Sequence, residues 1–227
     1  MTAQLIKLQA APDLVDRVYR ALLDAISDGS LAPSARITQE EIAEQLAVSR
    51  QPVLQALRLL KKDGLVQDAP GRGLIVAPLD PVWIARVYEV RGALDGLAAR
   101  LAAERRTPID PQLIVQGRRA ARGRDIKAMI EADIAFHNAI YEASGNPLIG
   151  ASATAHWVHL RRVMGAVLQS SPQRESLWDE HEAIAAAIAD GNAKRASELI
   201  HQHAFRASDT LRARLAVVLE TPLKGQS

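Results

Sequence analysis

Residues 37–60 read ITQEEIAEQLAVSRQPVLQALRLL, and this stretch decides the fold of the first third of the chain. Thr38, followed three residues later by Glu41, has the spacing of a capping box and predicts the start of a short helix. A tight turn follows, and Ser49 then stands where a second helix needs an N-cap. Pro52 falls in the first turn of that helix, where its missing N–H costs least. The stretch therefore predicts two helices joined by a short turn.

The flanks of this stretch complete the pattern of a known DNA-binding unit. An amphipathic helix is predicted over residues 13–28. Two short apolar runs at 65–66 and 74–76 enclose a glycine-rich turn, which indicates a hairpin. Helix, turn, helix and hairpin form a winged helix-turn-helix, whose second helix enters a DNA major groove.

Basic residues gather on the second helix and the hairpin. Arg50 stands at the helix start, where its guanidinium can meet the O6 and N7 atoms of guanine. Arg58, Lys61 and Lys62 are better placed for phosphates, and Arg72 lies at the hairpin tip. A solvated basic helix face is the alternative explanation of the same charges.

Two prolines, Pro78 and Pro81, mark a boundary between a first domain at 1–78 and a second at 79–227. After this boundary the apolar residues recur at helical spacing, with breaks that leave about six helices. The expected fold class is therefore mainly α, with a winged helix-turn-helix followed by an all-helical bundle.

Composition narrows the function classes. The 227 residues include no cysteine, which excludes a disulfide framework, a thiolate metal site and a cysteine nucleophile. No segment reaches the roughly 18 apolar residues that a membrane span needs, so we expect a cytoplasmic protein without a membrane partner. The net charge of +2 says little about nucleic acid.

The second domain holds every histidine of the chain. Asp133 and His137 are four residues apart, so a helix places both side chains on one face. His181 and His203 lie on later predicted helices. Three imidazoles and one carboxylate suit a divalent transition metal: zinc as first choice, with nickel, manganese, iron or cobalt as alternatives. The competing interpretation is that each histidine simply caps, packs or faces solvent.

The first domain resembles the GntR family of bacterial transcription regulators. The V-S-R-x-P-V-x-x-A-L core at 48–57 occurs together with G-L-V at 64–66 and G-R-G at 71–73. The resemblance implies that the hairpin glycines approach the minor groove and that Arg50 reads the operator. The candidate DNA-contacting residues are Thr38, Ser49, Arg50, Gln51, Pro52, Arg58, Gly71, Arg72 and Gly73.

Four positions depart from the usual pattern of that family. Leu54 stands where an arginine is usual, and Gln55 where a glutamate is usual. Ser34 replaces a frequent glycine, and Glu40 replaces an arginine of some relatives. We therefore expect an operator that differs from the commoner ones.

The second domain resembles the FadR-type C-terminal domain, known as FCD, over most of residues 80–210. In metal-binding members of that subfamily one aspartate and three histidines line a central cavity. By resemblance these map to Asp133, His137, His181 and His203, and all four are present. The resemblance implies that Arg91 faces inward and binds an anionic effector; the alternative is an ion pair between Arg91 and a neighbouring acid. Arg161 is a second candidate, unless its neighbour Arg162 faces inward instead.

These observations predict a homodimeric, ligand-responsive regulator that binds double-stranded operator DNA and a small carboxylate effector. Two alternatives stay open. One is a metal-dependent enzyme, although the chain has no H-E-x-x-H motif and no recognisable general base. The other is a metal-stabilised DNA-binding protein without an effector.

Overall fold

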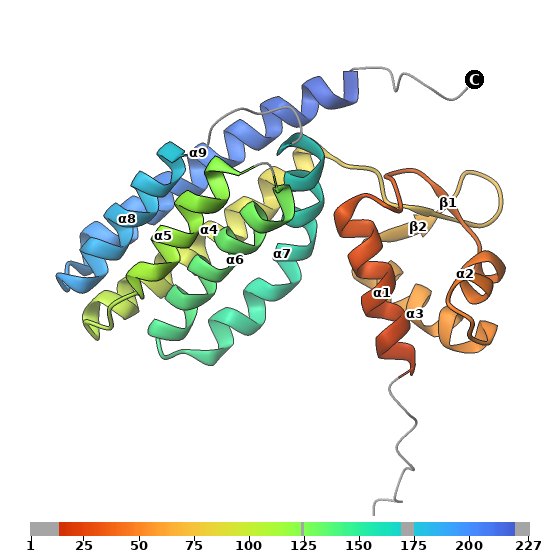
Figure 1. The fold of residues 1–227 in the computed structure, drawn as a ribbon, viewed down its shortest axis with the longest axis horizontal. Coiled ribbons are helices and arrows are strands. Elements are labelled where there is room, and N and C mark those ends of the chain that lie inside the picture. The colour runs from red at the N-terminus through yellow and green to blue at the C-terminus, as the bar shows by residue number, and fades with distance from the viewer. Residues whose placement is uncertain (1–13, 124, 169–174, 221–227) are drawn as a thin grey trace, which may run out of the picture. The chain divides into compact units, whose positions relative to one another are not determined.

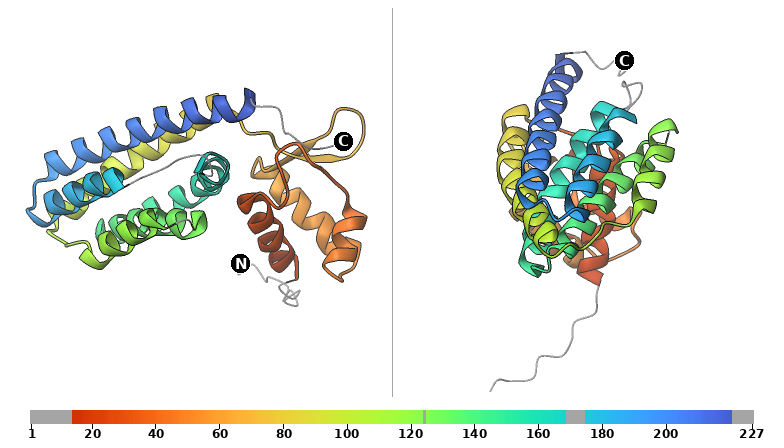
Figure 2. Two further views of the ribbon diagram at one scale, coloured as in Figure 1. Left: turned by 45° about the horizontal axis from the view of Figure 1, so that its top comes forward. Right: turned by 90° about the vertical axis from the view of Figure 1, so that its left-hand side faces the viewer.

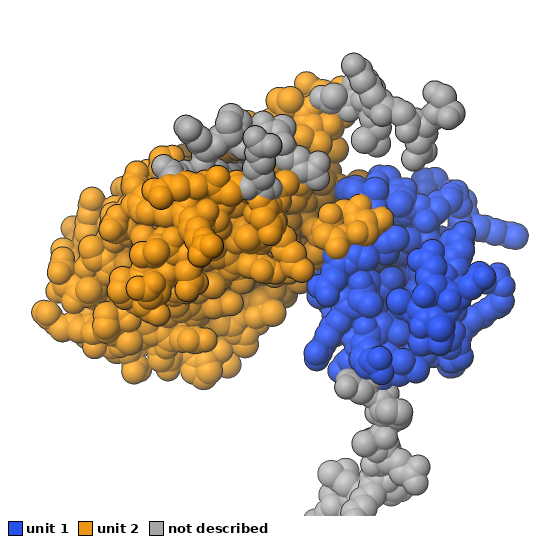
Figure 3. Space-filling model, viewed as in Figure 1, with its two compact units in different colours: residues 1–26, 31–77 blue, residues 27–30, 78–227 orange. Residues whose placement is uncertain are grey.

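A computed structural model of the chain describes residues 14–123, 125–168 and 175–220. The chain divides into two compact units (Figure 3). Unit 1 comprises Met1–Ile26 and Leu31–Ala77, and unit 2 comprises Ser27–Ser30 and Pro78–Ser227. Within the described ranges, no helix has both the length and the apolar character to cross a membrane.

Unit 1 is a winged helix-turn-helix (Figure 1). Its elements are α1 (Leu14–Asp28), β1 (Arg36–Ile37), α2 (Gln39–Gln45), α3 (Arg50–Lys62), β2 (Val66–Asp68) and β3 (Leu74–Val76). The predicted hairpin is confirmed as the antiparallel pair β2–β3. The strand β1, which the sequence did not predict, pairs with β3 and gives the strand order β1-β3-β2. Two residues are too few to show the alternation that predicts a strand.

The starts of α2 and α3 differ in their caps. The Thr38 hydroxyl accepts a hydrogen bond from the Glu41 backbone N–H at 3.2 Å, as the capping-box spacing predicts. Ser49 holds the N-cap position of α3, but its side chain makes no capping hydrogen bond. An N-cap side chain bonds the N–H of the second or third helical residue; Pro52, the third residue of α3, has none, and Ser49 makes no such bond to Gln51, the second. Ser49 thus holds the predicted N-cap position without the expected hydrogen bond.

The backbone conformation at position 34 explains why glycine is frequent there in the family. Ser34 adopts a positive φ of 67°, in the left-handed region that glycine enters without cost. A serine here carries strain of order 1 kcal/mol that a glycine would not. Ala47, in the turn between α2 and α3, has a φ of 51° and the same conformation.

Unit 2 is a bundle of six helices in its described ranges (Figure 2). They are α4 (Pro81–Glu104), α5 (Pro111–Arg122), α6 (Ile126–Ala143), α7 (Pro147–Leu168), α8 (Glu175–Ala189) and α9 (Ala193–Glu220). The long helices α4 and α9 lie side by side, and α6, α7 and α8 each pack against one or both of them. The prediction of a mainly α fold with about six bundle helices is confirmed.

A glycine in the middle of α5 makes room for an aromatic ring of α8. A Cβ atom at Gly117 would lie 2.0 Å from the buried indole of Trp178. The same indole meets the ring of His181 edge-on, with 4.6 Å between centroids. Helix α5 therefore supports His181 through Trp178.

Candidate metal centre and DNA-binding surface

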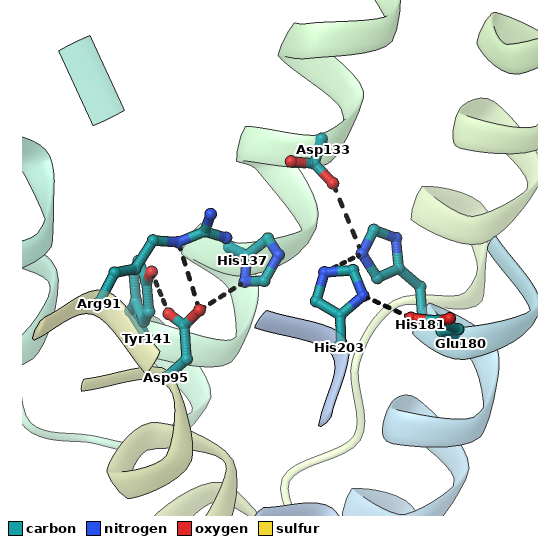
Figure 4. A network of polar contacts seen from close by, with 8 residues as sticks. All are labelled: Arg91, Asp95, Asp133, His137, Tyr141, Glu180, His181 and His203. Carbon is teal, nitrogen blue, oxygen red and sulfur yellow. Dashed lines mark hydrogen bonds and ion pairs between the residues drawn. The ribbon is translucent and has the colours of Figure 1, made fainter. Parts of the chain in front are cut away.

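Four side chains from three helices meet inside the bundle (Figure 4). Asp133 and His137 lie one turn apart on α6, His181 comes from α8 and His203 from α9. All four are buried, and one ligand atom from each lies within 4.8 Å of the others. We call these four residues the Asp/His cluster. The structure thus brings together the residues that the sequence singled out.

Several polar atoms of this cluster lack hydrogen-bond partners in the described residues, as expected for atoms that bind a metal ion. His181 Nε2 lies 3.3 Å from His203 Nε2 and 3.5 Å from Asp133 Oδ1. Neither ring nitrogen of His137 has a hydrogen-bond partner in the described part of the chain. Buried polar atoms without partners are costly, and a cation at their centre would satisfy several of them together.

The protonation of the cluster also suits a cation. Burial lowers the pKa of His137 well below 6.5, and the positive charge of Arg91 lowers it further. Burial likewise lowers the pKa of His181, with smaller contributions from His203 and Arg91. Both rings are therefore neutral at pH 7 and keep the lone pair that metal binding requires.

Two further carboxylates stand behind the cluster, and the sequence analysis missed both. Asp95 is fully buried, and its Oδ1 accepts a hydrogen bond from the Tyr141 hydroxyl at 2.5 Å. Glu180 Oε2 lies 2.9 Å from His203 Nδ1. Burial opposes ionisation of Glu180, but hydrogen bonds with His203 and Arg206 outweigh it and lower the pKa of this carboxyl.

A cavity of about 270 Å³ adjoins the cluster. Its wall is formed by Tyr88, Arg91, Asp133, Met164, Ser176, Leu177, Glu180, His203, Arg206, Ala207, Thr210, Leu211 and Arg214. Arg91 is buried, and its guanidinium carbon lies 3.8 Å from the ring centroid of Trp157. Burial alone would lower the pKa of Arg91, but the charge of Asp95 raises it, so the side chain stays a cation. Arg91 Nη2 has no hydrogen-bond partner among the described residues.

The structure corrects the second effector candidate. Arg161 is only partly buried and is not one of the described residues that line the cavity. Its neighbour Arg162 is the buried one, and burial lowers its pKa to about 10. Arg161 does fall on the helical stripe that includes Trp157 and Leu168. However, α7 is buried around more of its circumference than one stripe, so the periodicity does not decide between adjacent residues.

The predicted DNA-contacting side chains of α3 lie on its exposed face. Arg50, Gln51 and Arg58 are exposed. Arg50 forms an ion pair with Glu40 of α2, so its guanidinium is not free in the absence of DNA. Lys61, one of the expected phosphate contacts, pairs with Asp68 of the hairpin at 2.7 Å.

The hairpin tip presents Arg72 between two glycines. Gly71 and Gly73 have φ values of +94° and +96°, so any other residue would be strained there, although a Cβ atom would meet open space at Gly71 and only Arg36 Nη1, at 3.9 Å, at Gly73. Arg36 Nη1 donates to the backbone oxygen of Arg72 at 2.9 Å, and Nη2 donates to that of Pro70 at 3.4 Å. Arg36 thus braces the tip and leaves the Arg72 side chain exposed.

Comparison with known proteins agrees with this architecture. Residues 14–76 match the model for bacterial regulatory proteins of the gntR family, and residues 86–206 match the FCD domain. An uncharacterized HTH-type transcriptional regulator from the TAR-I ttuE-ttuC' intergenic region of Agrobacterium vitis is 33% identical over 133 residues. That alignment covers 56% of this chain and 78% of the relative. The HTH-type transcriptional regulator LutR of Bacillus subtilis is 29% identical over 217 residues, which cover 82% of this chain and 95% of LutR.

Solved structures show the same fold. Escherichia coli McbR/YncC superposes with a TM-score of 0.76 at 22% identity, covering 90% of this chain and all of that one. A putative GntR regulator from Rhodococcus sp. RHA1 gives a TM-score of 0.73 at 25% identity, covering 89% and 99%.

Fold and comparisons together define a two-domain DNA-binding transcription regulator. The chain belongs to the GntR family and carries an FCD domain. Its families and relatives are transcriptional regulators and not enzymes, so the enzyme interpretation is set aside. Regulators of this family bind operator DNA, and the Asp/His cluster is compatible with a metal ion.

Proposed function

We propose that this regulator binds a divalent metal at the Asp/His cluster and a small carboxylate in the adjoining cavity, and that the carboxylate controls its affinity for operator DNA. One observation carries the proposal: a buried set of one aspartate and three histidines faces a cavity whose wall includes Arg91. Zinc is the first choice for the ion, because it accepts nitrogen and oxygen donors without a strict geometry.

Asp133, His137, His181 and His203 would hold the ion. When bound, the ion supplies positive charge that attracts a carboxylate into the cavity. Arg91 contributes a second cationic group, and its Nη2 still has a hydrogen bond to give. The ligand class that fits is a small organic acid, since the cavity holds about 270 Å³.

The DNA-binding part of the proposal assigns α3 to the major groove and the hairpin tip to the minor groove. We propose a homodimer, whose two winged units match a two-fold symmetric operator. A bound acid then changes operator affinity by favouring one arrangement of the dimer. Linkage requires the converse as well: if the acid weakens DNA binding, DNA weakens acid binding equally.

The metal centre is tested with two histidines of α9. His203→Ala removes a cluster residue, whereas His201→Ala removes an exposed ring two residues away and serves as the control. Elemental analysis of purified protein is expected to find one ion per chain in the wild type and the His201 variant, and a reduced content in the His203 variant. Equal metal in all three proteins would contradict the centre.

The effector is tested by thermal unfolding with a panel of hydroxy acids, sugar acids, dicarboxylates and amino acids. A ligand that binds the folded state raises the melting temperature. The acid is expected to raise the melting temperature of zinc-loaded protein more than that of chelated protein, and to shift operator affinity. Equal shifts would remove the metal from the acid's site, and no shift across the panel would favour a metal-stabilised regulator without an effector.

A further inference from the structure

Two of the three cluster histidines each have a carboxylate at the far side of the ring. His137 Nδ1 lies 3.5 Å from Asp95 Oδ2, and His203 Nδ1 lies 2.9 Å from Glu180 Oε2. Neither carboxylate belongs to the Asp/His cluster. A carboxylate that accepts a hydrogen bond from the outer ring nitrogen fixes the tautomer and orientation of the ring and strengthens the nitrogen that faces a metal. Glu180 makes this hydrogen bond with His203, whereas Asp95 only approaches His137.

Each of these carboxylates also holds an arginine of the cavity wall. Arg91 Nε lies 3.2 Å from Asp95 Oδ2, and Arg206 Nε donates to Glu180 Oε1 at 2.9 Å. Two three-residue chains therefore run from the cavity to the cluster. The first is Arg91–Asp95–His137, and the second is Arg206–Glu180–His203. Figure 4 shows the first chain whole and the carboxylate and histidine of the second.

The two chains differ in their access to water. The first is buried throughout, and Asp95 Oδ2 lies between Arg91 and His137 without a hydrogen-bond partner in the described residues. In the second, the Arg206 side chain is 51% exposed and the Glu180 side chain 28% exposed. A ligand can therefore contact Arg206 and Glu180 without disturbing the core. A substitution of either residue is likewise expected to leave the core intact.

We infer that Glu180 is a positioning residue that links Arg206 of the cavity wall to His203 of the cluster, so that an acid in the cavity changes the affinity of the cluster for a metal ion. The inference rests on the proposed metal centre and adds how the ion and the acid communicate. An acid that binds the Arg206 guanidinium breaks its hydrogen bond with Glu180, so that His203 becomes the remaining partner in this chain for the Glu180 carboxylate. The carboxylate then accepts more strongly from His203, and His203 binds the ion more tightly. By linkage, the ion tightens acid binding by the same factor.

The first test measures Zn²⁺ affinity by competition with a chromophoric chelator. Glu180→Gln keeps the size of the side chain but removes its charge, and it is expected to weaken zinc binding about 10- to 100-fold. Glu182→Gln is the matched control, because Glu182 lies two residues away and pairs with Arg118 at 2.7 Å. The control variant is expected to bind zinc like the wild type.

The second test asks whether Arg206 acts through Glu180. Arg206→Gln removes a positive charge near the cluster, which tightens zinc binding to some extent whatever Glu180 does. The inference requires this tightening to be several-fold larger with Glu180 present than in the Glu180→Gln background. The same factor in both backgrounds would overturn it.

A spectroscopic readout separates positioning from a merely structural role. In metal-free wild-type protein, ¹⁵N chemical shifts are expected to show the His203 proton on Nδ1, facing Glu180, and this preference is expected to weaken in Glu180→Gln. Circular dichroism checks that the variants are folded. If wild-type protein binds no zinc, the metal centre and the inference both fail. If it binds zinc and the Glu180 variant binds equally well, only the inference fails.

Discussion

Two arginine–carboxylate pairs, one in each unit of this regulator, lie in opposite environments. Arg50 and Glu40 in unit 1 have side chains that are 64% and 71% exposed. Arg91 and Asp95 in unit 2 are 2% and 0% exposed. The exposed pair contributes about 0–1 kcal/mol, because water already solvates both charges. The buried pair lacks that water, so each charge depends on the other.

The difference shows what each pair can do. Glu40 can release Arg50 to a phosphate or a guanine at little cost, so this pair can be exchanged for a contact with DNA. Arg91 can leave Asp95 only if another anion replaces it. If an acid binds in the cavity as proposed, Arg91 is therefore expected to exchange Asp95 for an anionic group and not for a neutral one.

The largest expected effect comes from breaking the buried pair. Asp95→Ala leaves the Arg91 charge uncompensated and is expected to lower the free energy of unfolding of unit 2 by about 3–5 kcal/mol. Urea unfolding followed by tryptophan fluorescence measures this, because Trp83, Trp157 and Trp178 all lie in unit 2. Asp95→Asn keeps an acceptor for Tyr141 and is expected to cost less. A loss below about 1 kcal/mol in the alanine variant would show that Arg91 has other compensation.

The next largest effect is a difference between the two units in how their stability depends on pH. The lowered pKa values of His137 and His181 mean that the folded state prefers both rings neutral, whereas in the unfolded chain they take up a proton near 6.5. Their contribution to stability is therefore complete above pH 6.5 and is lost as the pH falls below it. Metal-free protein is expected to show a falling melting temperature by tryptophan fluorescence between pH 7.5 and 5. Unit 1 contains no histidine, so the part of the circular-dichroism transition that tryptophan fluorescence does not report is expected to change less.

The smallest effect on stability is expected at the exposed pair, where the change appears in DNA binding instead. Glu40→Ala is expected to alter the free energy of unfolding by less than about 0.5 kcal/mol. It frees Arg50, so binding to random-sequence duplex is expected to strengthen and its salt dependence to steepen by about one counterion.

The matched variant Arg50→Ala completes this prediction. It is expected to abolish preference for a duplex selected by the wild-type protein from a random library, with the fold intact. Fluorescence anisotropy at several salt concentrations measures both variants. Unchanged preference in the Arg50 variant would remove this residue from base recognition.

The parts of the molecule that the sequence predicted depend on neighbouring residues. The capping residue Thr38 and the turn before Ser49 act within a few positions, so the helix-turn-helix could be recognised from a short window. The same window did not show that Ser49 makes no capping hydrogen bond. The strand β1 was missed because its only evidence is its partner β3.

The Asp/His cluster was predictable only in part. Asp133 and His137 share a helix face by spacing, whereas His181 and His203 were matched to them through the resemblance to a known domain. The supporting carboxylates Asp95 and Glu180 come from α4 and α8 and meet their histidines only through tertiary packing. Many acidic residues occur on these helices, and no spacing rule distinguishes those two.

Gly117 has no side chain and lies outside the Asp/His cluster, yet the space above it fixes where the Trp178 indole rests against His181. The two positions form a size-exchange pair. A mutational survey is expected to find Gly117 intolerant of even alanine, and to find that intolerance relieved when Trp178 is replaced by a smaller ring. Among diverging relatives, a side chain at position 117 is then expected only where position 178 carries a residue smaller than tryptophan. The volume added on α5 then equals the volume removed on α8.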